Sequence, residues 1–331
     1  MSLRIGIVGF EPGTHSHGYL SAAEQSPEVE LAAVAYRPDL LAELPGPMSK
    51  QLSALDVPVY TQGEELLERE ELDILALTTV PDEQADLIVA GLQRGLHVGG
   101  DKPFVTERED LARVRQELAA HPGLRVFMML SMRGDPTRIA ARQLLKDGAI
   151  GTLAAAHSRR AYEQRRGSRP DWYFDERRSG GPLADGAIHG IDEVLWVTGQ
   201  GWQAVVGYEA NQSWPEQTRF FDNGQVLFRL EDDVTAIIEH HRLALGDNYF
   251  SLLGTDGKIE QTRGHPLRLL TAEGEREITD LPPGRNIFAD FVESIVANRP
   301  SLVDTEDVFA AMEAVFAARE ATKRGEKVQA G

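Results

Sequence analysis

The sequence lacks cysteine, which excludes disulfide bonds, thiolate metal sites and cysteine-based redox chemistry. Basic residues are fewer than acidic ones, 34 against 52, and the formal charge is −18. Such a negative surface argues against nucleic acids and anionic membranes as partners. The chain shows neither an apolar run of about eighteen residues nor a charged-then-apolar leader. We therefore expect a soluble protein without a membrane span or signal peptide, and by default a cytoplasmic location.

What is present is a chain of 331 residues, long enough for two domains with sizeable cores. Over residues 1–128 apolar strands alternate with helices, a pattern typical of a doubly wound parallel sheet. The expected strands are 3–9, 30–36, 72–78, 96–99 and 124–130, and the expected helices are 15–25, 38–43, 63–69, 82–94 and 106–120.

From residue 129 to 331 the pattern becomes rich in strands, which predicts an α+β domain with a large, mostly antiparallel open sheet. One face of such a sheet can pack on helices and the other on a second subunit, so we expect a homodimer or homotetramer. The last expected helix, 304–324, can pack back on the first domain. The other expected elements are strands 152–162, 202–210, 215–222, 224–230, 233–242, 247–254 and 257–262, and helices 185–198 and 286–298.

The segment SGGPLADGAIHGID, residues 179–192, places a carboxylate and an imidazole four residues apart after a glycine turn. In a helix, Asp185 and His189 share one face, with Cβ atoms about 5 to 6 Å apart. An aspartate at that distance can hold the imidazole in one tautomer, while the free ring nitrogen exchanges a proton near neutral pH. The pattern predicts an acid/base dyad. The alternative is that Asp185 caps the helix and His189 is structural.

Lys102 is a second candidate, because it stands at the end of an expected strand. Residues 72–106 are predicted to form strand, helix and strand, and the strand ends of such a unit open onto the ligand crevice of a parallel sheet. Pro103 pushes Lys102 into an extended conformation and allows a cis peptide bond, so the amine has a fixed direction. The alternative is a solvated loop lysine.

These motifs resemble those of the Gfo/Idh/MocA family of sugar and polyol oxidoreductases, and the resemblance covers nearly the whole chain. In that family the lysine, aspartate and histidine at these positions surround the reacting carbon, which implies catalytic roles for Lys102, Asp185 and His189. The resemblance also implies a Rossmann domain, NADP or NAD as cofactor, and a small sugar or polyol as substrate. The matching segments are IGIVGF (5–10), HVGGDKP (97–103), MRGDP (132–136), SGGPLADGAIHGID (179–192) and NIFADFVESI (286–295).

The first glycine loop departs from the family pattern. A dinucleotide fingerprint, GxGxxG, lets the backbone approach a pyrophosphate at a helix N-terminus. Counting from Gly9, this chain has Glu11 and Thr14 where the second and third glycines belong, and Glu11 sets a negative charge beside a diphosphate. Gly13 can restore the turn, and Thr14 can cap the next helix. The expected cofactor loop consists of Gly9, Phe10, Pro12, Gly13 and Thr14.

The end of the second strand bears on the choice of cofactor. NAD sites usually have an acid there that accepts the ribose hydroxyls, whereas this chain has Tyr36 and Arg37. An arginine can bind a 2′-phosphate and stack on adenine. The sequence therefore favours NADP(H), with a surface arginine as the alternative.

Three further expectations concern the surroundings of the cofactor. Gln84 stands where the family usually has a histidine, and we expect this to change cofactor contacts more than mechanism. No metal site is expected, since His15 and His17 point in different directions on a helix and no third ligand follows. The backbone expected to pass the nicotinamide ribose belongs to Thr79, Val80 and Pro81.

An arginine-rich run, residues 159–178, precedes the dyad segment. Arginines can bind carboxylate or phosphate, and aromatic side chains can stack on a sugar ring. Tyr162 and Trp172 are therefore candidate substrate contacts, and the substrate can be an acidic sugar; Arg133 is a separate candidate. The alternative is a solvated loop that pairs with the chain's surplus acids across a subunit contact. Its arginines are Arg159, Arg160, Arg165, Arg166, Arg169, Arg177 and Arg178.

Together these residues predict hydride transfer between a substrate carbinol carbon and a nicotinamide. His189 would exchange the hydroxyl proton, Asp185 would orient His189, and Lys102 would hold the substrate oxygen, although Lys102 and His189 can exchange roles. Three other interpretations stay open: an NAD-dependent glycoside hydrolase, a non-catalytic ligand sensor and a scaffolding subunit. The candidate acid/base set argues against the last two.

Overall fold

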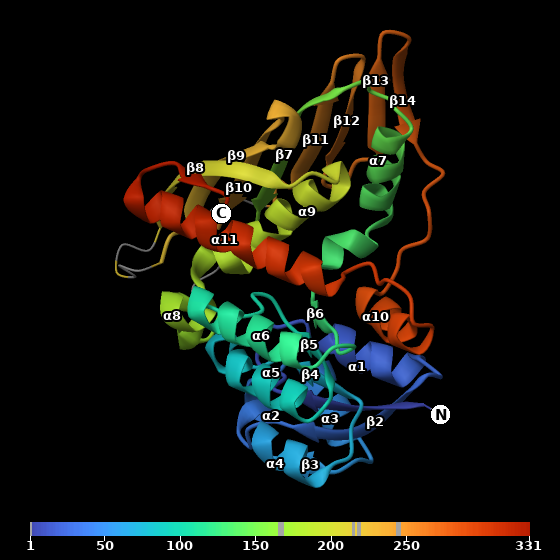
Figure 1. Cartoon of the computed structure of the whole chain (residues 1–331), viewed down its shortest axis with the longest axis vertical. Helices are drawn as coiled ribbons and strands as arrows, with labels where there is room; N and C mark the ends of the chain where they lie inside the picture. The colour runs from blue at the N-terminus through green and yellow to red at the C-terminus, as the bar shows by residue number, and fades with distance from the viewer. Residues whose placement is uncertain (1, 165–168, 214–215, 217–219, 243–245) are drawn as a thin grey trace.

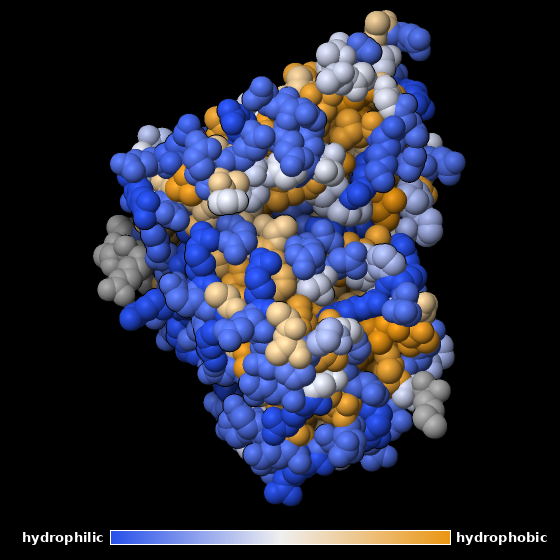
Figure 2. All heavy atoms as spheres, in the orientation of Figure 1, coloured by the Kyte–Doolittle hydropathy of each residue, from blue (hydrophilic) through white to orange (hydrophobic). Residues whose placement is uncertain are grey.

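The structure is a computed structural model that describes residues 2–164, 169–213, 216, 220–242 and 246–331. Two sheets, each with its own helices, lie one below the other in Figure 1, and helix α11 (Thr305–Arg324) crosses the junction between them. Hydrophilic side chains cover most of the face shown in Figure 2, as the net charge predicts.

The first sheet has six parallel strands in the order β3-β2-β1-β4-β5-β6, which confirms the predicted doubly wound sheet. The order reverses between β1 and β4, and ligands bind at such a switch point. The strands are β1 (Leu3–Val8), β2 (Val29–Ala35), β3 (Val59–Tyr60), β4 (Ile74–Leu77), β5 (His97–Gly100) and β6 (Val126–Met128). The helices are α1 (Ser16–Gln25), α2 (Leu40–Glu43), α3 (Gly46–Ser53), α4 (Gly63–Arg69), α5 (Gln84–Gln93) and α6 (Arg108–Ala120).

The second sheet has nine strands in the order β14-β13-β12-β11-β7-β10-β9-β8-β15 and is mostly antiparallel, as expected. The exception is the pair β7 and β10, which run parallel. The segments that follow them therefore lie side by side, and the Tyr162 amide donates to the carbonyl of His241 at 3.0 Å. The strands are β7 (Leu153–Ala161), β8 (Trp202–Ala210), β9 (Asn223–Leu230), β10 (Thr235–His241), β11 (Tyr249–Gly254), β12 (Gly257–Thr262), β13 (Leu267–Thr271), β14 (Gly274–Ile278) and β15 (Val328–Gln329).

Helix α9 (Ile188–Thr198) lies on the inner face of this sheet. The contact is close: a side chain at Gly190 would come within 2.9 Å of both Ser158 and Ile238. Asp185 belongs to a π-helical turn, Leu183–Ala187, that leads into α9. The other helices are α7 (Pro136–Lys146), α8 (Glu176–Ser179) and α10 (Ile287–Val296).

Helix α11 connects the two domains. From α11, Arg319 donates to the Thr106 carbonyl at 2.6 Å, and Glu313 pairs with Arg108 of α6 at 2.5 Å. Of the expected strand 215–222, residues 215 and 217–219 lie outside the described residues, and residues 216 and 220–222 are not in a strand. Sequence patterns missed the short strands β3, β13, β14 and β15 and the helices α3, α7 and α8. None of the described helices is long and apolar enough to cross a lipid bilayer.

Candidate active site

Lys102 stands at the carboxyl edge of the first sheet, two residues beyond β5. The buried Gln84 side chain accepts from the Asp101 amide at 3.0 Å and donates to the Pro103 carbonyl at 2.9 Å. The peptide between Lys102 and Pro103 is cis. Gln84 thus fixes the loop that carries Lys102, which is a structural role that the sequence did not indicate.

The Asp185 carboxylate of the second domain accepts a hydrogen bond from Lys102 of the first domain. Lys102 Nζ lies 2.5 Å from Asp185 Oδ1 and 2.9 Å from its backbone carbonyl. Tyr173 donates its hydroxyl to Asp185 Oδ2 at 2.7 Å, and the fully buried Arg242 binds the same oxygen. Burial raises the pKa of Asp185, but the charges of Lys102 and Arg169 outweigh it and hold that pKa well below its usual value. The carboxylate is therefore ionised when it holds Lys102.

His189 lies in the first turn of α9, and no hydrogen bond joins it to Asp185 among the described residues. Its Nδ1 atom is buried and has no hydrogen-bond partner among the described residues. Burial, together with the positive charges of Lys102 and His15, lowers the pKa of His189 well below its usual value. The imidazole is thus neutral at neutral pH and able to accept a proton.

The expected hydrogen-bonded dyad of Asp185 and His189 is therefore not formed. The four-residue spacing assumed a regular α-helix, whereas Asp185 lies in a π-helical turn. Within the described chain its carboxylate bonds Lys102, Tyr173 and Arg242 instead. The three predicted catalytic residues do lie together, but Asp185 positions the lysine and not the histidine.

A second pair, His15 and Asp101, lies beside His189 and was missed by sequence reasoning. His15 Nδ1 lies 2.7 Å from Asp101 Oδ1, and its amide donates to Oδ2 at 2.5 Å. The His15 and His189 rings pack edge to face, with centroids 6.0 Å apart. Burial raises the pKa of Asp101, but the charge and hydrogen bonds of His15, together with the charge of Lys102, have the larger effect in the opposite direction. The net result is a lowered pKa, so Asp101 is ionised.

Tyr162 and Trp172, two predicted substrate contacts, lie near the partners of Asp185. The Arg242 guanidinium stacks on the Tyr162 ring at 4.1 Å, and Trp172 packs against Tyr173 with centroids 6.1 Å apart. Arg242 carried no sequence signal beyond its place at the end of an expected strand. Burial lowers its pKa to about 9, so it stays charged at neutral pH.

The arginine predictions have mixed outcomes. Arg133 lines a cavity of about 290 Å³ that is separate from Lys102, Asp185 and His189. Its guanidinium pairs with Asp192 and Asp307, each at 2.6 Å. Its expected substrate contact is therefore not supported. Arg159, Arg160 and Arg178 pair with acidic residues of the same chain, Arg160 with the buried Glu193, so pairing across a subunit contact stays untested. Arg165 and Arg166 lie outside the described residues.

The loop after β1 keeps the shape of a dinucleotide cradle. Gly9 has φ +116°, and a Cβ there would lie 2.3 Å from the Thr78 backbone. The Phe10 side chain is fully buried, so only its backbone can face a ligand. Gly13 has φ +92°, and Arg169 of the second domain approaches its carbonyl at 3.4 Å.

The rest of the loop differs from expectation in one detail. The Thr14 hydroxyl donates to the Glu11 carbonyl at 2.7 Å, so it does not cap α1, whose N-cap residue is His15. Pro12 is partly exposed in the same turn. Val80 and Pro81 follow β4 after Thr78 and Thr79, and both are buried.

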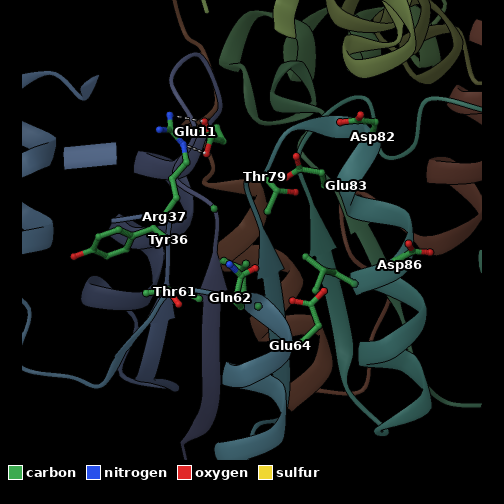
Figure 3. A pocket seen from close by; sticks show the side chains of 15 residues that line it. Glu11, Tyr36, Arg37, Thr61, Gln62, Glu64, Thr79, Asp82, Glu83 and Asp86 are labelled. Atoms are coloured by element: carbon green, nitrogen blue, oxygen red, sulfur yellow. Dashed lines mark hydrogen bonds and ion pairs between the residues drawn. The ribbon is translucent and has the colours of Figure 1, made fainter. Parts of the chain in front are cut away.

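A cavity of about 430 Å³ opens at the ends of β1, β2 and β4 (Figure 3). Glu11 and Arg37 lie joined on one side of it, and Asp82, Glu83 and Asp86 lie on the other. Its wall also includes Gly9, Tyr36 and Thr79. A cavity beside a positive-φ glycine at the switch point fits the adenosine half of a dinucleotide.

Comparisons with known proteins agree with this geometry. Residues 3–129 match the model of an oxidoreductase family with an NAD-binding Rossmann fold, and residues 139–260 match the Gfo/Idh/MocA C-terminal domain. The chain is 24% identical to inositol 2-dehydrogenase 3 of Saccharopolyspora erythraea over 60% of its length and 54% of that protein. It is 25% identical to the rhizopine catabolism protein MocA of Rhizobium meliloti, over 60% of this chain and 57% of that one. The matched part spans about half the length of the first curated relatives.

Solved structures share the fold over nearly the entire chain. An oxidoreductase domain protein from Kribbella flavida is 19% identical with a TM-score of 0.85, covering 99% of both chains. The scyllo-inositol dehydrogenase of Lactobacillus casei with bound NAD(H) and scyllo-inositol is 21% identical with a TM-score of 0.77, also over 99% of both. With both domain models matched in order along one sequence, the chain belongs to the Gfo/Idh/MocA oxidoreductase family.

Proposed function

We propose that this protein is a nicotinamide-dependent dehydrogenase that acts on a carbinol carbon of a small polyol or sugar. The observation that carries the proposal is the meeting of Lys102 and Asp185, 2.5 Å apart, beside a neutral His189 at the carboxyl edge of the first sheet. Family membership and relatives named inositol 2-dehydrogenase support the same reaction class.

The chain's own residues divide the work between holding an oxygen and moving a proton. Lys102, anchored by Asp185, would donate a hydrogen bond to the substrate oxygen and stabilise its developing charge. His189 would take the hydroxyl proton during oxidation and return it during reduction. Tyr173 and Arg242 would keep the Asp185 carboxylate ionised and oriented. A bound nicotinamide would supply the hydride chemistry.

The cofactor is NAD or NADP, and the contacts of Arg37 do not favour the NADP(H) preference predicted from the sequence. All three of its side-chain nitrogens already bind carboxylates, which leaves no free donor for a 2′-phosphate.

The experiment is an oxidation assay with purified protein. Inositol stereoisomers, common sugars and the matching uronic acids are each supplied with NAD⁺ or NADP⁺, and formation of the reduced nicotinamide is followed by absorbance. We expect turnover with at least one polyol or sugar and its loss in Lys102→Met and His189→Gln. Absence of turnover across the panel, together with cleavage of an aryl glycoside, would instead support the glycoside hydrolase.

A further inference from the structure

Glu11 and Arg37 form a two-point ion pair at the mouth of the 430 Å³ cavity (Figure 3). Arg37 Nε lies 3.0 Å from Glu11 Oε1, and Arg37 Nη2 lies 3.3 Å from Oε2. The Glu11 amide donates to the Thr78 carbonyl at 3.0 Å, and the whole residue is only 8% exposed. Glu11 is therefore held in one place by both its backbone and its side chain.

Arg37 has no donor nitrogen to spare. Besides Glu11, it binds Glu43 at 2.8 and 2.6 Å and Asp39 at 2.9 Å. Hydrogen bonds to Glu43 and Glu11 raise the pKa of Arg37 far above its usual value. One guanidinium thus binds three carboxylates, and the cluster of Arg37 with Glu11, Glu43 and Asp39 carries a net negative charge. A phosphate that approached Arg37 would have to displace a carboxylate and would meet the remaining ones.

The opposite wall of the cavity is also lined by carboxylates. Asp82, Glu83 and Asp86 line it, with Glu64 at its floor, and Arg37 is the cation among its lining residues. Arg178 pairs with Asp82 and Glu83, and Arg113 pairs with Asp86, so these acids offer carboxylate oxygens while much of their charge is already compensated. Its carboxylate oxygens can accept hydrogen bonds from hydroxyls, whereas discrimination against a phosphate depends on Glu11 and on the occupied donors of Arg37.

We propose that Glu11 is the residue that recognises the adenosine ribose and that it selects NAD(H) over NADP(H). Glu11 would accept the 2′ and 3′ hydroxyls through the lone pairs that Arg37 leaves free, in place of the acid that is missing at the end of β2. Arg37 acts as a positioning residue that orients Glu11. This inference rests on the proposed nicotinamide-dependent function and names its cofactor.

The test is direct binding of NADH and NADPH by calorimetry, so that turnover is not needed. Wild type should bind NADH at least about tenfold more tightly than NADPH, the difference expected from one charge-assisted hydrogen bond. Glu11→Gln keeps the shape of the side chain and removes its charge. This variant should bind NADH more weakly and NADPH more tightly than wild type. Glu293→Gln is the matched control, because Glu293 also pairs with an arginine, Arg299 at 3.1 Å, but neither residue lines the cavity or contacts Arg37; both affinities should stay within about threefold.

Arg37→Gln provides a second variant that does not alter Glu11 itself. If Arg37 positions Glu11, NADH binding weakens and NADPH binding does not fall. If Arg37 instead binds a 2′-phosphate, only NADPH binding falls, and the proposal is overturned. Equal or tighter NADPH binding by wild type also overturns it while leaving the dehydrogenase function standing. Failure of wild type and Glu11→Gln to bind either nucleotide, with both proteins folded, overturns the dehydrogenase function itself.

Discussion

Replacing Asp185 by asparagine removes one buried negative charge and keeps the shape of the side chain. The native carboxylate faces Lys102, whose side chain is 8% exposed, and the fully buried Arg242. Removing one partner of a buried ion pair leaves an uncompensated charge and costs about 3 to 5 kcal/mol. In a domain of roughly 200 residues each kcal/mol lowers Tm by about 2 to 4 °C, so we expect a fall of about 6 to 20 °C.

The assay is thermal and denaturant unfolding followed by circular dichroism, with Asp86→Asn as control. Asp86 makes the same kind of pair, with Arg113 at 2.7 Å, but its side chain is 82% exposed. Removing that exposed pair should therefore cost no more than about 1 kcal/mol. A loss below about 1 kcal/mol in Asp185→Asn would refute the reasoning.

The pH dependence of this effect gives a second check. The folded pKa of Asp185 lies below its unfolded value of about 3.9, so its contribution is present above that pH and is lost as the pH falls through the folded pKa. The stability gap between wild type and Asp185→Asn should therefore shrink in acid below about pH 4. A gap that persists unchanged at pH 2 contradicts the assignment.

Three further predictions follow from the site and the second sheet. The folded pKa of His189 lies below 6.5. Wild-type stability should therefore fall as the pH drops through about 6.5, by up to about 1.4 kcal/mol per pH unit. In unfolding curves from pH 5 to 7, His189→Gln should lack this slope. Lys102→Met should lower kcat about 100-fold or more while NADH affinity measured by calorimetry stays within about threefold; near wild-type turnover would exclude its role. The outer sheet face exposes Tyr208, Leu227, Ile237 and Leu253 by 42 to 72%, so light scattering at micromolar concentration should show a dimer or tetramer that Leu227→Asp dissociates, and a monomeric wild type would rule this interface out.

The sequence predicted the elements whose periodicity or caps are strong. The apolar run of β4 is completely buried, and α11 begins at a capping box formed by Asp304 and Asp307. Lys102 was predicted from its place after a strand, because strand ends in a parallel sheet converge on one crevice. These inferences depend on local pattern, which a single sequence shows.

What the sequence could not show was which distant residues meet. Glu11 was interpreted as an unfavourable charge because its neighbour Arg37 lies 26 positions away. Asp185 was assigned to His189 because the π-helical turn is invisible in an i to i+4 pattern. Its actual partner Arg242 follows β10, and the parallel pairing of β10 with β7 leaves no trace in a period of two residues.

Because β7 and β10 run parallel, their carboxyl ends lie together in the second domain. Tyr162 and Arg242 directly follow β7 and β10, and the Arg242 guanidinium stacks on the Tyr162 ring and binds Asp185. Loops at such an edge can change length and composition while the strands behind them keep every ladder hydrogen bond. A mutant library aimed at new substrates would therefore vary Tyr162 and keep Arg242, because the buried Arg242 is a partner of Asp185.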